Sequence, residues 1–117
     1  MFFKFANKKS CTSNENHNGV NEKKVCVMVL DVFSITIDEV KHTVIIGIPS
    51  NGSISLNDIL QHQGREKTEE LKVVKLEQLE KLGVAISTVE EYEQVAIWVD
   101  KYMGGKIAKG EELVKVS

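Results

Sequence analysis

A chain of 117 residues with a formal net charge of −2 can bury the core of one domain but is too short for a multidomain enzyme. The near-neutral balance excludes a globally basic nucleic-acid binder, so any binding of RNA would need a local basic patch. No stretch has the length of a membrane span or of the apolar run of a signal peptide, so we expect no membrane partner and a cytoplasmic location. The two cysteines, Cys11 and Cys26, are too few for a disulfide framework and predict a reduced thiol pair.

Residues 1–24 are the first distinct segment. Five lysines face only two glutamates there, and from Asn7 to Lys24 the sequence holds a single valine. So little apolar surface does not offset the entropy cost of ordering the chain. The sequence therefore predicts a mobile, polar and basic tail over 1–24 and a folded domain over 25–117.

Three extended segments follow the tail. Residues 25–37, VCVMVLDVFSITI, are rich in β-branched side chains and lack turn residues, which indicates a largely buried strand. Residues 41–49 form a second such segment, and Asn51-Gly52 supplies a turn because both residues tolerate positive φ. Residues 53–60, SISLNDIL, resume the extended pattern.

The next segment, 66–83, is ambiguous from its residues alone. A stripe of apolar residues that ends at Gly83 favours a helix, whereas the spacing around Val73 and Val74 also fits a strand with a register slip. Beyond it, 92–102 and 112–116 indicate strands, with MGGK at 103–106 as a turn. Short strands at this spacing favour a small closed β-barrel.

Several motifs, in a common order and at nearly constant spacing, resemble the second domain of elongation factor Tu and its translation-GTPase relatives. They are DVFSIT at 31–36, TVIIGIPSNGSISLNDIL at 43–60, KLEQLEKL at 75–82, QVAIWVD at 94–100 and KIAKGEELVK at 106–115. The resemblance implies an all-β fold, a closed antiparallel Greek-key barrel of about six strands. It also implies a strand at 71–77 and a short helical or turn piece at 78–83.

The chain departs from this family at positions that matter for function. Residues 37–42 replace the family's G-R-G, which lengthens the first hairpin and makes it more acidic. By the resemblance, Glu77 takes the place of a glutamate that lies against the terminal adenosine of aminoacyl-tRNA. Residues 78–80 replace the Met, aromatic and Arg beside it, and Tyr92 replaces a glycine. No phosphate-binding loop of the form G-x-x-x-x-G-K-(S/T) occurs, so we expect no nucleoside triphosphate as a partner.

No residue pattern predicts catalysis. His17, His42 and His62 fit no nucleophile or metal motif and are interpreted as surface residues, and the glutamates as solvated surface. We expect a protein that is not an enzyme and has no cofactor or metal site. The candidate RNA-binding residues, chosen because aromatic and cationic groups stack bases and hold phosphates, are Arg65, Lys67, Glu77, Trp98, Lys101, Tyr102 and Lys106. For Trp98, its place in the middle of a strand favours the core over a binding role, because large aromatic side chains are mostly buried.

Two functions remain open. In the first, the barrel binds RNA or the translation machinery and regulates gene expression; its size and tail resemble small barrel regulators carried on conjugative plasmids of Gram-positive bacteria. In the second, it is a protein-interaction module that has kept the barrel and lost its RNA face. A basic face bearing aromatic residues would favour the first function, and an exposed apolar patch without basic neighbours the second.

Overall fold

A computed structural model describes residues 24–64, 66–80 and 84–117 of the chain. The described residues form β-strands and no helix, which confirms the all-β prediction. The strands are β1 (Cys26–Ile37), β2 (Val40–Ser50), β3 (Ile54–Ser55), β4 (Ile59–Gln63), β5 (Thr68–Gln78), β6 (Ala85–Ile86), β7 (Thr88–Val89), β8 (Val95–Val99) and β9 (Glu112–Lys115). Within these residues, no helix has the length and apolar character needed to span a membrane.

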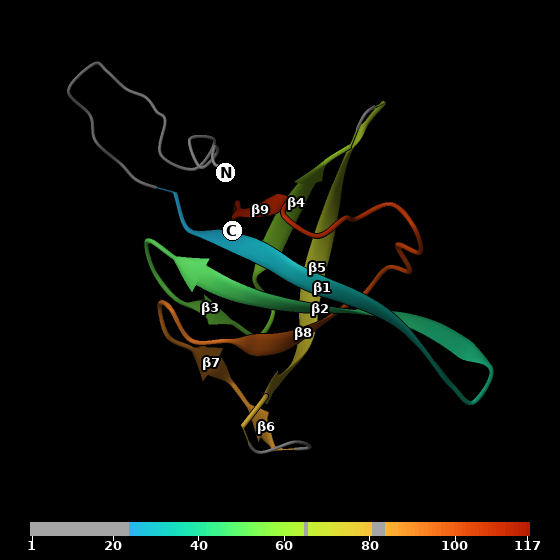
Figure 1. The fold of residues 1–117 in the computed structure, drawn as a ribbon, viewed down its shortest axis with the longest axis horizontal. Helices are drawn as coiled ribbons and strands as arrows, with labels where there is room; N and C mark the ends of the chain where they lie inside the picture. The colour runs from blue at the N-terminus through green and yellow to red at the C-terminus, as the bar shows by residue number, and fades with distance from the viewer. Residues whose placement is uncertain (1–23, 65, 81–83) are drawn as a thin grey trace.

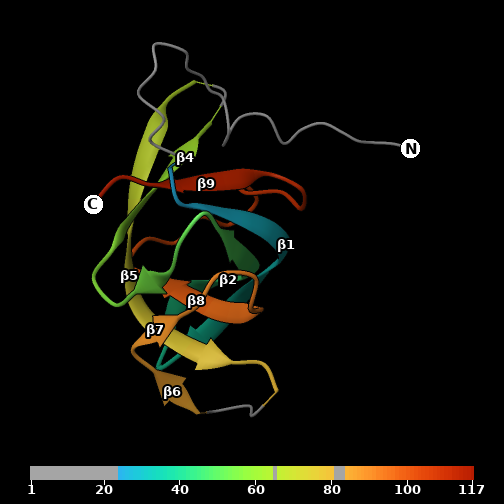
Figure 2. The same ribbon diagram turned by 90° about the vertical axis from the view of Figure 1, so that its left-hand side faces the viewer.

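Six of these strands close into the predicted antiparallel barrel. The strand order is β4-β9-β1-β2-β8-β5-β6, and β4 also pairs with β5, so that only β6 extends beyond the closed ring. β9 lies between β4 and β1, and β8 between β2 and β5, so several neighbours in the barrel are distant in the chain, as expected of a Greek key. The strands wrap around one interior in both views (Figure 1; Figure 2), and β3 pairs with β7 in a separate small sheet.

The ambiguous segment is a strand. β5 runs unbroken to Gln78, and a bulge between Val73 and Lys75 is the register slip that its sequence indicated. The predicted strand at 71–77 is therefore confirmed, and the local helical pattern was overridden by pairing with β4 and β8. Of the predicted helical or turn piece at 78–83, Leu79 and Glu80 form a bend, and 81–83 lie outside the described residues.

Two predictions concern the amino-terminal part of the chain, namely the tail over 1–24 and the reduced thiol pair. The predicted tail lies, apart from Lys24, outside the described residues. Cys26, at the start of β1, is fully buried. Cys11, the other member of the predicted thiol pair, lies outside the described residues, so the reduced pair stays a prediction.

The core lies inside the barrel and consists of the alternate residues of each strand that point inward. Its largest fully buried side chains are those of Ile45, Ile54, Leu60, Leu71, Leu76, Ile97, Met103 and Leu113. Of these eight side chains, seven belong to strands, and that of Met103 belongs to the segment that connects β8 to β9. Burial of this side chain fixes the long connection between β8 and β9, drawn in orange to red in Figure 1.

Hydrogen bonds hold that connection in place. The Met103 N–H donates to the hydroxyl of Thr43, which is itself fully buried in β2, at 2.7 Å. The Lys106 N–H donates to the Met103 carbonyl at 2.9 Å, which closes the predicted turn at 103–106. Gly105 lies within this turn at a φ of 76°, a conformation that favours glycine. The connection is thus a fixed support for Lys101 and Lys106.

We predict that Thr43→Val destabilises the fold by about 1–3 kcal/mol, because it leaves the Met103 N–H buried without an acceptor. Urea denaturation would measure the change in free energy of unfolding. Thr36→Val, an exposed position of β1 on the same face of the hairpin, is the matched control and should change it by less than about 0.5 kcal/mol. Equal effects of the two substitutions would contradict the anchoring role of Thr43.

Candidate functional site

Three of the predicted RNA-binding lysines converge on one carboxylate. The ammonium nitrogens of Lys67, Lys101 and Lys106 lie 3.5, 3.4 and 3.9 Å from the carboxylate oxygens of Glu69. The side chain of Glu69 is only 15% exposed, whereas all three lysines are exposed. We call these four residues the Glu69 lysine cluster. Three cations share one anion, so the cluster as a whole keeps positive charge on the surface.

The cluster is assembled from two parts of the fold. Lys67 and Glu69 belong to the β4–β5 hairpin, whose turn is closed by a hydrogen bond from the Gly64 N–H to the Lys67 carbonyl at 2.9 Å. Lys101 and Lys106 belong to the connection that follows β8. Residues more than thirty positions apart therefore meet because the barrel closes and Met103 anchors the connection.

The neighbouring lysines lower the pKa of the Glu69 carboxyl. Partial burial acts to raise the pKa of its carboxyl, but the hydrogen bond from Lys101 and the charge of Lys67 outweigh that effect and lower the pKa below the ordinary value. The carboxylate therefore stays ionised down to a lower pH than that of an ordinary glutamate.

A pocket of about 400 Å³ adjoins the cluster, and we call it the His62 pocket. Its lining residues are His62, Gly64, Glu66, Lys67, Glu69, Met103, Lys106 and Glu111. His62 lies directly opposite Glu69 in the β4–β5 ladder. It is 3% exposed, so the interpretation of this histidine as a surface residue was wrong. Its Nε2 lies 3.0 Å from a carboxylate oxygen of Glu111.

Glu77 and Trp98 form a second group. The indole N–H of Trp98 donates to the Glu77 carboxylate at 3.0 Å, and the Lys75 ammonium lies 3.3 Å from the other oxygen of that carboxylate. The same ammonium lies 4.8 Å from the centre of the Trp98 ring, a cation–π contact. Trp98 is half-buried between strand neighbours that point inward, Ile97 and Val99, so it faces outward and the core alternative was wrong.

Tyr102 belongs to neither group. Its ring lies 5.6 Å from the ammonium of Lys41, and its hydroxyl accepts a hydrogen bond from Ser34 at 3.4 Å. Both contacts come from the β1–β2 hairpin. Arg65, the remaining predicted site residue, lies outside the described residues. The structure thus joins Lys67, Lys101 and Lys106, pairs Glu77 with Trp98, and places Tyr102 beside the hairpin.

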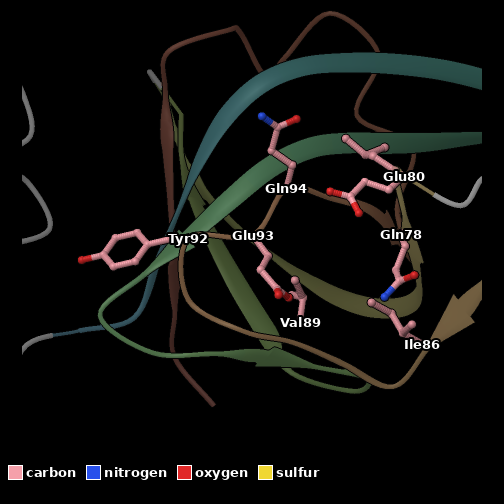
Figure 3. Close-up of a pocket in the computed structure, with 8 residues that line it drawn as sticks. Gln78, Glu80, Ile86, Val89, Tyr92, Glu93 and Gln94 are labelled. Carbon is pink, nitrogen blue, oxygen red and sulfur yellow. The ribbon is translucent and has the colours of Figure 1, made fainter.

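A second pocket, of about 410 Å³, contains the positions where the chain departs from the translation-factor pattern. It is lined by Gln78, Leu79, Glu80, Ile86, Val89, Tyr92, Glu93 and Gln94. These lining residues include two carboxylates and neither lysine nor arginine, which disfavours phosphate there. Tyr92 has a φ of 69°, and its ring points away from the other labelled side chains (Figure 3). Among the described residues, no three metal-ligating side chains gather at either pocket or elsewhere.

Comparisons with known proteins support the fold. No protein-family model matches the chain, and neither does any curated protein. Among solved structures, it is similar to the GTPase-like domain of Ski7 from S. cerevisiae, bound to GDP and inorganic phosphate, with a TM-score of 0.63 and 14% identity. The match covers 88% of this chain and 25% of that one, so the chain corresponds to about a quarter of its neighbour. The fold is therefore one that also occurs within a GTPase-like protein, in agreement with the predicted barrel.

The lowered pKa of Glu69 is open to direct test. We predict that its carboxyl titrates below the ordinary glutamate value, and that Lys67→Met with Lys101→Met moves the midpoint upward, because the two lysines named as causes are gone. The chemical shift of the side-chain carboxyl carbon against pH would measure both midpoints. An unchanged midpoint for Glu69 in the double variant would contradict the account.

Proposed function

We propose that this protein is a non-enzymatic barrel that binds RNA and regulates gene expression, with the Glu69 lysine cluster as its contact to the phosphate backbone. The convergence of Lys67, Lys101 and Lys106 on Glu69 carries the proposal. A chain with a net charge of −2 has no general attraction for RNA, so a fixed group of exposed cations is the feature that binding requires.

Glu69 has a specific role in this proposal. Lysine side chains lose substantial rotamer entropy when they are ordered, and a shared carboxylate orders three of them before any ligand arrives. The ion pairs are individually weak because the lysines are exposed. Phosphate oxygens can therefore replace the carboxylate as partners at small cost, while the lysines stay close together.

The fold gives independent but coarser support. Its likeness to part of the Ski7 GTPase-like domain fits a barrel with a task connected with translation. The motifs shared with the second domain of translation GTPases point in the same direction. Because the described residues that line the pocket at Gln78–Gln94 include carboxylates and no cation, we place the RNA contact at the lysine cluster and not there. We also propose that the cytoplasm is where this contact is made.

The proposal predicts opposite effects from two changes of charge in the cluster. Lys101→Glu with Lys106→Glu should weaken RNA binding and lower the slope of log affinity against log salt concentration by about two. Glu69→Gln should strengthen binding, because it removes the anion that competes with phosphate. Fluorescence anisotropy with a labelled random-sequence RNA pool would measure both.

The matched control is Lys72→Glu with Lys109→Glu, which changes the net charge equally at exposed lysines outside the cluster. The control should lose much less affinity than the cluster variant, and all variants should keep the unfolding midpoint of the wild type. The proposed contact would be wrong if the folded cluster variant bound RNA as well as the control.

One observation favours the second candidate function, a protein-interaction module. Phe33, Ile35, Ile37 and Val40 lie on one face of the β1–β2 hairpin and are between 36% and 55% exposed. Figure 1 shows this end of the hairpin projecting away from the other strands. Its turn carries Asp38 and Glu39, both at positive φ. Exposed apolar patches mark interaction sites, and the acidic turn fits a protein partner with a basic flank.

If the hairpin docks a protein, Phe33→Ser with Ile35→Ser should remove that partner and leave the affinity for RNA unchanged. Proteins retained from cell extract by the immobilised variant and by the wild type would be compared by mass spectrometry. Val74→Ser, which alters an equally exposed apolar residue on β5, is the control. A set of retained proteins that is the same for all three would exclude a partner at the hairpin.

A further inference from the structure

The His62 pocket contains a buried nitrogen without a partner. The Nδ1 atom of His62 is the one buried side-chain polar atom, within the part of the chain that the structure describes, that lacks a hydrogen bond. A buried polar atom without a partner is destabilising relative to a satisfied one, so proteins rarely retain one without a use for it.

The hydrogen-bond partner of Nε2, the other ring nitrogen, determines whether Nδ1 donates or accepts a hydrogen bond. Nε2 lies 3.0 Å from a carboxylate oxygen of Glu111, and the same oxygen accepts the N–H of Ala108 at 2.9 Å. A carboxylate only accepts hydrogen bonds, so Nε2 must carry a proton. In the neutral imidazole, Nδ1 is then a hydrogen-bond acceptor without a donor.

The position of Gly64 shows where that donor can approach. A Cβ atom placed on Gly64 would lie 3.9 Å from Nδ1 and 3.8 Å from the neighbouring ring carbon Cε1, and Gly64 lines the same pocket. A Cβ there would also come within 2.8 Å of the Lys67 carbonyl oxygen. Gly64 therefore adds no side chain over this edge of the ring, where Nδ1 itself is buried.

The surroundings indicate the ligand. Lys67 and Lys106 line the pocket and provide cations beside three carboxylates, those of Glu66, Glu69 and Glu111, while Nδ1 provides a buried acceptor. A ligand that suits both has an anionic group and, close to it, a hydroxyl that can donate. The ribose 2′-hydroxyl of RNA lies next to the phosphate in every nucleotide and is the group by which proteins distinguish RNA from DNA.

We propose that the His62 pocket is a ribose-reading subsite in which Nδ1 accepts a hydrogen bond from a 2′-hydroxyl while Lys67 and Lys106 hold the adjoining phosphate. This inference rests on the proposed RNA-binding function and adds to it a reason for selecting RNA over DNA. The pocket volume of about 400 Å³ lies in the range of sites that take a small organic group.

Three labelled probes test the proposal by fluorescence anisotropy. They are short random-sequence pools of RNA, of the matching DNA and of 2′-O-methyl RNA. All three contain phosphates and base amino groups, but only RNA can donate from the 2′ position. The wild type should bind RNA about tenfold more tightly than DNA or 2′-O-methyl RNA, the factor that about 1.4 kcal/mol represents.

His62→Gln should abolish that preference. The glutamine amide can still donate to Glu111 from a position near that of Nε2, but it leaves no acceptor in place of Nδ1. Affinity for RNA should fall to the level for DNA, and affinity for DNA should not change. His42→Gln, at the half-buried histidine beside Trp98, is the control and should keep the preference.

Each other outcome counts against a specific claim. Equal binding of the three pools by the wild type, or a preference for RNA that survives in folded His62→Gln, would overturn the ribose subsite while leaving RNA binding in place. A His62→Gln variant that loses affinity for all pools equally would assign His62 a structural role only. Failure of the wild type to bind any pool at low salt would overturn both this inference and the proposed function.

Discussion

The pairing of β4 with both β5 and β9 is the constraint on which the rest of the structure depends, because it closes the sheet into a barrel. The same register places His62 opposite Glu69. The strand pairing that closes the barrel therefore also brings these two site residues together. Met103 then enters the core from the connection after β8 and brings Lys101 and Lys106 to that end of the barrel. A solvent-exposed group of cations is in this way supported by buried apolar contacts, which are the strongest stabilising interactions available to so small a domain.

Charge is distributed unevenly over this framework. The cluster around Glu69 holds an excess of cations, the pocket at Gln78–Gln94 holds carboxylates, and the turn of the β1–β2 hairpin is acidic. A chain with little net charge can therefore still present one face to a polyanion and repel it elsewhere. The aromatic side chains are distributed differently again, since Trp98 is engaged by Glu77 and Lys75, and Tyr102 by the hairpin. Electrostatic contact, and not base stacking, is consequently the main attraction that we assign to the site.

Much of the fold could be predicted from the sequence, because strand periodicity and turn residues are local signals. The segment 66–83 could not be assigned from its residues, since its preference for β5 arises from pairing with strands that are distant in sequence. Lys67, Lys101 and Lys106 were found as cationic residues near aromatic ones, but nothing local shows that they share Glu69, which was taken for a solvated carboxylate. His62 was missed although a signal existed, because it follows the buried Leu60 by two positions in β4 and so points to the same side.

The central claim is that this barrel binds RNA through charge, and the most direct measurement is the retention of total cellular RNA by the purified protein at a low and a high salt concentration. Our account predicts retention at low salt that falls steeply as salt rises, because lysine contacts to phosphate release counterions. Sequencing of the retained RNA would then identify the target of regulation. Retention no greater than that of an unrelated protein with the same net charge, even at low salt, would contradict the account and leave the exposed hairpin face as the surface to investigate.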